Sequence, residues 1–303
     1  RGEEARMSEG QSGIPTPAGY SPLAEASVAA YCCRSDELRG VLGLAGAGPE
    51  EAARQLDVQE VGDGNLNFVY IVRAPGGRAC VVKQALPYVR CVGESWQLTL
   101  ERASFEHSAL REHGRLAPGG VPDVFLFDST NALIAMHFLA PPHKIMRKHL
   151  IEGARLPRAA RDLASFCAKT LFGSSALALP AKDLRARVAE WSRNSEMCAL
   201  TENVVFTEPY WAAPLNRHTD PELDGYAASV RGDCALACAA ALLKGRFLGC
   251  PQALIHGDLH TGSVMAHEGS TVVIDPEFAC YGPMGFDTGS LVANLLLAFF
   301  AQR

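Results

Sequence analysis

The order of apolar and polar positions predicts that the first part of the chain is rich in β-strands. Between residues 58 and 86, three strand-like runs are separated by the turns GDGN and APGG, and apolar or aromatic residues stand at the alternate positions 66, 68, 70 and 72. Alternation of this kind places one set of side chains on one face of a sheet. Two further runs, DVFLFD and ALIAMHFL, follow a stretch of helical composition at residues 98–113. We therefore expect a small antiparallel sheet with one inserted helix.

After Pro141 and Pro142 the pattern changes to long segments rich in Ala, Leu and Arg. The segment CALACAAALL is apolar on every side, which is typical of a buried helix. Short strand-like runs return among these segments. The helices are predicted at residues 157–172, 182–200 and 222–247, and the short strands near residues 254–255, 263–265 and 271–274. Together with the first part, this predicts an α+β protein with a β-rich N-lobe and a mainly helical C-lobe, joined near residues 136–142.

The polar first 21 residues are rich in Gly, Ser and Pro, and they lack the apolar centre of a signal peptide. Such a composition buries too little apolar surface to fold, so residues 1–21 are expected to form a disordered tail. The chain begins with Arg and its first methionine is Met7, so its start need not be the native one. The N-lobe is then expected at residues 22–139 and the C-lobe at residues 140–303.

Composition narrows the possible functions. With 48% apolar residues and a formal net charge of −5, the chain has no general electrostatic attraction to nucleic acid or to anionic membranes. The longest apolar runs, at residues 234–243 and 291–301, are too short to span a bilayer. Ten cysteines at irregular spacing favour free thiols, and thus a cytoplasmic protein, over a disulfide framework.

The stretch HGDLHTGSVMAHEGSTVVIDPE, from His256 to Glu277, concentrates acids and histidines around two short strand-like runs. Phosphoryl transfer needs a carboxylate that orients the attacking hydroxyl and further carboxylates that hold Mg²⁺. Asp258 suits the first role, whereas Asp275 and Glu277 suit the second. The alternative is a dinuclear metallohydrolase, which needs further His and Asp groups at distant strand ends, and the other histidines have no such context. His256 and His260 are better explained as residues that support the loop.

Three features elsewhere in the chain agree with this chemistry, although each has a simpler explanation. The turn between Gly62 and Asn67 could bring backbone N–H groups close to phosphate, but such turns also make ordinary hairpins. Lys83 lies within an apolar strand and could pair with phosphates and with Glu106, or else with Glu101. Its simpler explanation is an edge-strand lysine that points to solvent. Asp287 opens an apolar helix, either as its N-cap or as an acceptor for the backbone of the catalytic loop.

Several blocks together resemble the methylthioribose kinase family, within the aminoglycoside-phosphotransferase-like and protein-kinase-like superfamily. They are GDGNLN, VVKQALPYVRCVGESWQLTLERASFEHSAL, MHFLAPPHKIMRKHLIEG, LTENVVFTEPY, HGDLHTGSVM and VIDPEFACYGPMGFD. The resemblance runs from about Pro22 to the last residue. It implies a two-lobed kinase-like fold and transfer of the ATP γ-phosphoryl group to the anomeric 1-hydroxyl of 5-methylthioribose, a step of methionine salvage. It also implies Mg²⁺ as the cofactor and, more weakly, a homodimer. Related kinases for an aminoglycoside, choline or homoserine are the nearest alternative.

The resemblance also implies roles for individual residues. Asp258 stands at the catalytic-base position, and Ser263 stands where most kinases of the superfamily carry a metal-binding Asn, beside the metal ligands Asp275 and Glu277. Trp96, in VGESW, is expected to contact the sugar. His256, His260 and Asp287 are expected to support the catalytic loop. The expected nucleotide contacts are Gly62, Asp63, Gly64, Asn65, Asn67, Lys83 and Glu106 on the phosphate side, and Met136, His137, Phe138 and Leu139 on the adenine side.

One departure from the family is visible at the C-terminal end. Family members continue beyond the position of Arg303 through further helices, which supply a pair of arginines that bind the sugar and the transferred phosphate. The chain is therefore expected to lack its C-terminal part. This departure raises a third alternative, a nucleotide-binding pseudokinase. Retention of Lys83, Asp258, Asp275 and Glu277 together favours an enzyme.

Overall fold

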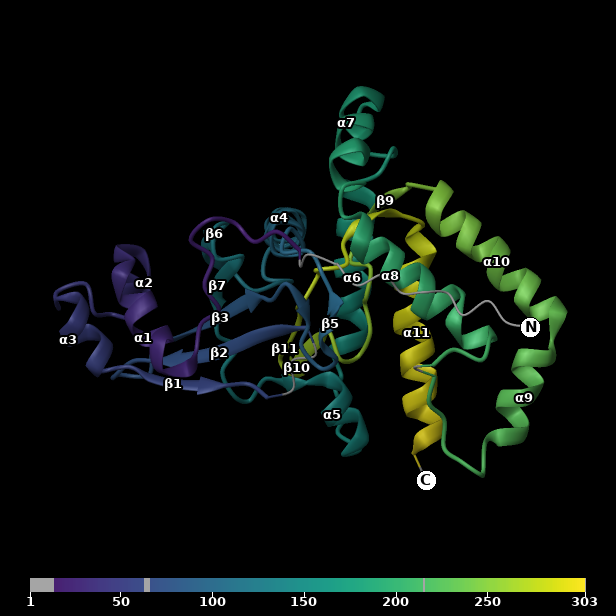
Figure 1. The fold of residues 1–303 in the computed structure, drawn as a ribbon, viewed down its shortest axis with the longest axis horizontal. Helices are drawn as coiled ribbons and strands as arrows, with labels where there is room; N and C mark the ends of the chain where they lie inside the picture. Colours follow the sequence, from purple (N-terminus) through teal and green to yellow (C-terminus); the bar gives the residue numbers. More distant parts are fainter. Residues whose placement is uncertain (1–13, 63–65, 215, 303) are drawn as a thin grey trace, which may run out of the picture. The chain divides into compact units, whose positions relative to one another are not determined.

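The computed structural model describes residues 14–62, 66–214 and 216–302, and the chain divides into two compact units (Figure 1). Unit 1 comprises residues 1–104 and 125–136, and unit 2 comprises residues 105–124 and 137–303. Unit 1 is built on a five-stranded sheet and unit 2 is mainly helical, so the predicted α+β class is confirmed. Residues 105–124, which we expected in the N-lobe, belong to unit 2.

The sheet of unit 1 has the strand order β1-β2-β3-β7-β6. Strand β2 pairs antiparallel with both β1 and β3, and Tyr70 of β2 lies opposite Val82 of β3. Tyr70 and Val72 are buried, as the alternating pattern predicted. The strands are β1 (Asp57–Glu60), β2 (Asn67–Arg73), β3 (Ala79–Ala85), β6 (Val124–Asp128) and β7 (Leu133–His137), and the short pair β4 (Tyr88–Val89) and β5 (Gly93–Gln97) stands apart from this sheet.

Three short helices that the sequence analysis did not predict pack on this sheet. They are α1 (Glu25–Arg34), α2 (Asp36–Val41) and α3 (Pro49–Arg54). Their apolar side chains share one core cluster with Tyr70, Val72 and Val82. The segment before them is also attached, because the Tyr20 hydroxyl donates to the carbonyl of Ala85 at 2.9 Å. The expected disordered tail therefore does not extend to Tyr20, and its first 13 residues lie outside the part of the chain that the structure describes.

Two of the long helices predicted for the second half are each divided into two. The segment 182–200 contains α7 (Ala181–Trp191) and α8 (Ser195–Phe206), and the segment 222–247 contains α9 (Asp224–Gly232) and α10 (Cys234–Gly249). The second break has a clear cause, because the Asp233 side chain accepts from the backbone N–H of Leu236 and so begins a new helix at an angle of 69°. The other helices are α4 (Arg102–Leu116), α5 (Met146–Ile151), α6 (Ala159–Gly173), η1 (Glu208–Tyr210) and α11 (Met284–Ala301).

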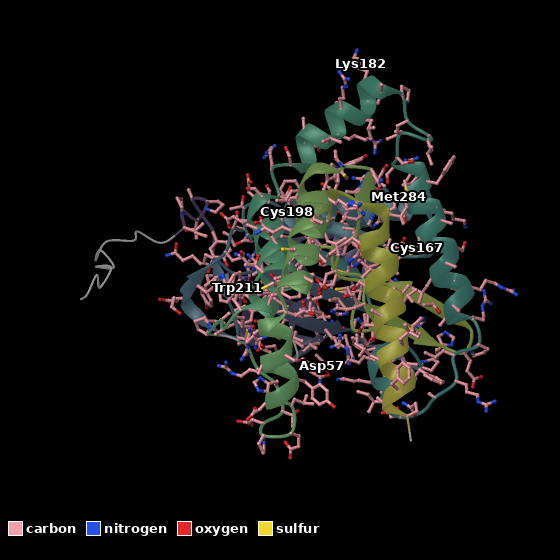
Figure 2. All side chains as sticks on the ribbon, turned by 90° about the vertical axis from the view of Figure 1, so that its right-hand side faces the viewer. Asp57, Cys167, Lys182, Cys198, Trp211 and Met284 are labelled. Atoms are coloured by element: carbon pink, nitrogen blue, oxygen red, sulfur yellow. The ribbon has the colours of Figure 1, made fainter. Side chains whose placement is uncertain are left out.

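The prediction that CALACAAALL forms a buried helix is wrong. In α10 only Ala240 and Phe247 are buried, whereas Leu242 is 72% exposed. The apolar helix α11 is similarly open, and Phe300 near its end is 78% exposed (Figure 2, where α11 is the yellow helix that begins at Met284). A helix that is apolar on every side favours burial, but its composition does not show which other residues pack against it.

The length of α11 corrects a further expectation. With 18 residues, Met284–Ala301 is long and apolar enough to cross a bilayer, whereas the shorter run read from the sequence was judged too short. The bent pair α9 and α10 passes the same test if counted as one segment. Length and composition alone are weak evidence, since core helices of soluble proteins pass the same test.

Short strands in unit 2 stand on both sides of the segment HGDLHTGS. One sheet has the order β11-β10-β8, and a second pairs β12 with β9. Because β9 ends at Ile255 and β10 begins at Val264, the segment HGDLHTGS is a loop between two fixed strands. The strands are β8 (Lys144–Ile145), β9 (Ala253–Ile255), β10 (Val264–His267), β11 (Ser270–Val273) and β12 (Cys280–Gly282).

Candidate active site

The start of the loop at residues 256–263 is held by a buried carboxylate from α11. Asp287 accepts from the backbone N–H of His256 at 2.6 Å and from that of Gly257 at 3.0 Å. Burial raises the pKa of Asp287, while the charge of His256 and these two hydrogen bonds act in the opposite direction. The N-cap of α11 is Pro283, so the N-cap interpretation of Asp287 is wrong and the expected contact with the loop is present.

His256 joins this loop to the end of β11. Its Nε2–H donates to the carbonyl of Ile274 at 2.9 Å, and its Nδ1 accepts from the backbone N–H of Asp258 at 3.2 Å. Gly257 has a φ of +82°, and a Cβ at this position would lie 2.2 Å from the carbonyl oxygen of Phe278. Only glycine fits such a backbone at such a distance. The two residues that precede Asp258 thus constrain its position.

His260 approaches the Asp258 side chain from within the same loop. Its Nδ1 accepts from the backbone N–H groups of Gly262 at 2.9 Å and Ser263 at 3.1 Å, so the neutral ring carries its proton on Nε2. That Nε2 lies 3.5 Å from Oδ2 of Asp258. The hydroxyl of Ser263 donates to the backbone carbonyl of Asp258 at 2.9 Å. The predicted support by His256 and His260 therefore has a geometric basis, whereas metal binding by Ser263 stays a prediction.

Three carboxylates of unit 2 converge beside this loop. Glu106 of α4, Asp275 and Glu277 offer oxygens that all lie within 4.8 Å of one another, and Glu106 and Glu277 are buried. Asp275 has a φ of +68°, an uncommon backbone conformation that is often found at functional sites. Clustered carboxylate oxygens are ligands of the kind that Mg²⁺ prefers. The set fits the predicted metal site, and it adds Glu106, which the sequence analysis had placed beside Lys83.

Asn194 was missed by the sequence analysis, although it positions one of these acids. It lies at the break between α7 and α8 and is 1% exposed. Its side-chain amide donates to the backbone carbonyls of Glu277 at 3.0 Å and Ala279 at 2.9 Å. These partners are separated from Asn194 by more than 80 positions, so no local pattern could have indicated the contact.

Two of the predicted phosphate-binding residues, Lys83 and Asn67, lie in strands of the unit 1 sheet. Lys83 is 9% exposed and stands in β3, the central strand of the sheet, so the edge-strand interpretation is wrong. Asn67 begins β2, and its Oδ1 accepts from the fully buried guanidinium of Arg102 at 2.9 Å. The sequence analysis did not single out Arg102. Asp63, Gly64 and Asn65 lie outside the described residues.

The residues predicted to contact the adenine or the sugar range from buried to exposed. Met136 is buried at the end of β7, and the backbone N–H of the exposed His137 donates to the carbonyl of Asp123 at 2.8 Å. Phe138 and Trp96 are half-buried, the latter in β5, and Leu139 is also half-buried. Their roles in binding nucleotide or sugar stay predictions.

Comparison with known proteins defines the class. Residues 57–301 match the model of the phosphotransferase enzyme family, and the chain belongs to that family. It is 51% identical over 284 residues to "Methylthioribose kinase 1" of Oryza sativa subsp. japonica, covering 94% of this chain and 64% of that protein. It is 42% identical over 287 residues to "Methylthioribose kinase" of Escherichia coli O45:K1, covering 94% and 66%. The chain thus spans just under two thirds of either relative.

Among solved structures, the chain is similar to a choline/ethanolamine kinase family protein from Mesorhizobium loti. The TM-score is 0.46 at 17% sequence identity, and the match covers 88% of this chain and 76% of that one.

Proposed function

We propose that this chain carries the catalytic residues of a kinase that transfers the γ-phosphoryl group of ATP to the 1-hydroxyl of 5-methylthioribose. The observation that carries the proposal is the identity of 42–51% to methylthioribose kinases over 94% of the chain. Asp258, Asp275 and Glu277 supply the acidic groups that the reaction requires. The reaction would take place in the cytoplasm, in keeping with ten free cysteines.

In this mechanism Asp258 orients the sugar hydroxyl and accepts its proton as the new bond to phosphorus forms. The leaving ADP retains the β–γ bridging oxygen. Asp287 and His256 keep the backbone of Asp258 in place, which contributes orientation. Mg²⁺, held by Asp275 and Glu277, would neutralise phosphate charge when bound. Lys83 would pair with the nucleotide phosphates.

The test is a coupled ADP-release assay with Mg-ATP and one acceptor at a time. The acceptors are 5-methylthioribose, choline, homoserine and an aminoglycoside. Release with methylthioribose alone supports the proposal, and release with another acceptor would assign the chain to a related kinase. Measurable binding of Mg-ATP without release from any acceptor would indicate a nucleotide-binding protein that does not turn over.

Two variants assign the chemistry. Asp258→Asn should lower kcat by about 10³-fold with little change in the affinity for ATP, because orientation and proton acceptance are lost together. Asp183→Asn is the matched control, since Asp183 is exposed in the first turn of α7, away from the catalytic loop in sequence. Near-normal turnover by Asp258→Asn would remove Asp258 from the mechanism.

The metal site has its own measurement. Mn²⁺ can replace Mg²⁺ at carboxylate sites and is visible by electron paramagnetic resonance. Asp275→Asn and Glu277→Gln should each weaken Mn²⁺ binding by about tenfold or more, because each removes a charged ligand. The resemblance to the family adds a homodimer, which light scattering on the purified chain would test.

A further inference from the structure

Arg147, in the first turn of α5, contacts the catalytic loop, and the proposed mechanism gives it no role. Its backbone N–H donates to the carbonyl of Thr261 at 2.9 Å. Its guanidinium Nη2 lies 3.3 Å from Nδ1 of His260. The backbone contact remains with any side chain except proline, so the side chain makes a separate contribution.

Gly262 makes room for this contact. A Cβ at position 262 would lie 2.6 Å from Cε1 of His260 and 2.8 Å from Nη2 of Arg147. Any larger residue would have to push apart the two groups that meet there. The need for glycine at position 262 is thus explained by the close approach of Arg147 and His260, without any unusual φ angle at this position.

His260 transmits the position of Arg147 to the reacting carboxylate. Nδ1 faces Arg147 and the backbone donors of Gly262 and Ser263, and Nε2 on the opposite side of the ring faces Oδ2 of Asp258 at 3.5 Å. A five-membered ring held on one side by several donors has little freedom to rotate, so its other nitrogen stays directed at Asp258. The group held in this way is the one expected to accept the proton of the sugar hydroxyl.

We propose that Arg147 is a positioning residue for phosphoryl transfer, which acts through His260 on the carboxylate of Asp258. The inference rests on the proposed function, because it assigns Arg147 to the same reaction. Arg147 is exposed, so its ionic contribution to stability is small, and its effect is on orientation. A displacement of a catalytic group by about 1 Å can cost up to about 100-fold in rate.

The kinetic test compares Arg147→Met, which keeps the length and apolar stem of the side chain, with Arg147→Lys. The methionine variant should lose about tenfold in kcat with an unchanged KM for ATP, and the lysine variant, which retains a cationic donor, should recover most of that loss. Gly262→Ala should reproduce the loss, since it displaces the same pair. Arg155→Met is the matched control and should retain wild-type kcat, because Arg155 is an exposed arginine just after α5. A methionine variant with wild-type kcat would overturn the proposal.

A double-variant cycle separates positioning from direct contact with substrate. His260→Ala should lower kcat by more than Arg147→Met, and adding Arg147→Met to it should cause no further loss, because the path through the ring is already gone. If the two losses multiply instead, Arg147 acts on the substrate or phosphate directly and the proposal is wrong.

A measurement without substrate keeps this inference distinct from the proposed function. In ¹⁵N spectra of histidine side chains, the resonances of His260 are assigned by their absence in His260→Ala. In Arg147→Met the chemical shift of His260 Nδ1 should change, because this nitrogen loses the hydrogen bond from the guanidinium. In Arg155→Met the chemical shift should be the same as in the wild type. An unmoved resonance in Arg147→Met overturns the proposal even if the wild-type chain phosphorylates methylthioribose. If the resonance moves but no acceptor is phosphorylated, the proposed function fails while Arg147 still orients His260.

Discussion

His113, on the buried side of α4, should make unit 2 sensitive to acid. The residue is 1% exposed, and its ring meets the edge of Phe166 with centroids 5.6 Å apart. Burial, helped by the charge of His256, lowers the pKa of His113 from 6.5 to about 3. In the folded chain the ring is therefore neutral at every pH above about 3, whereas in the unfolded chain it takes up a proton below 6.5.

The consequence for stability follows from proton linkage. Between pH 6.5 and about 3 the unfolded state binds more protons at this site than the folded state, so the free energy of unfolding falls as the pH falls. Each pH unit below 6.5 costs about 1.4 kcal/mol, and at pH 5 the loss from this one residue is about 2 kcal/mol. Above pH 6.5 the ring is neutral in both states and has no effect on the free energy of unfolding, and below about pH 3 the loss stops growing.

The assay is urea unfolding at pH 7.5 and pH 5, with tryptophan fluorescence as the signal that monitors unfolding. Trp191 is a suitable probe because it is buried in the core of unit 2 beside Phe105. His113→Phe retains an aromatic ring against Phe166 but cannot titrate. The wild type should lose about 2 kcal/mol more than this variant between the two pH values. Equal losses would show that His113 is not a buried neutral group, and the reasoning would be refuted.

Three further predictions concern stability. Gly257→Ala should destabilise the chain by about 3 kcal/mol or more, because a Cβ would stand 2.2 Å from the carbonyl oxygen of Phe278. The measurement is the midpoint of thermal unfolding, and a shift of less than about one degree would contradict the prediction. Asn194→Leu should lower the free energy of unfolding in urea by about 2–4 kcal/mol, because the buried carbonyls of Glu277 and Ala279 lose their donor. An unchanged midpoint of urea unfolding would show that these two hydrogen bonds do not stabilise the chain. Because Phe300 is 78% exposed, Phe300→Ser should change the free energy of unfolding by less than about 0.5 kcal/mol. The same variant should show less self-association in light scattering. A large loss of stability would mean that other residues cover the ring in solution.

The local pattern was a good guide to the strands and to the loops between them. Alternating apolar positions predicted β2 and its neighbours, and Tyr70 and Val72 are buried as expected. The loop that carries Asp258 lies between two short strands, also as predicted. Such features are accessible because side-chain direction alternates along a strand and turn residues mark its ends.

The sequence was a poor guide to which helices are buried. The composition of α10 indicated a buried helix, but most of its apolar side chains are exposed among the described residues. The helices α1 to α3 escaped prediction, although the start of α2 has an N-cap serine, Ser35. Composition describes what a segment could cover, whereas packing against other segments decides what it does cover.

The sequence by itself determined the α+β class, the family and the set of acids that the proposed chemistry needs, because motifs and periodicity are properties of neighbouring residues. Only the tertiary structure brought Glu106 next to Asp275 and Glu277, and Arg147 against His260. Arg147 and His260 are 113 positions apart. Contacts across such separations arise when whole elements pack against one another, so they leave no local signal in the chain.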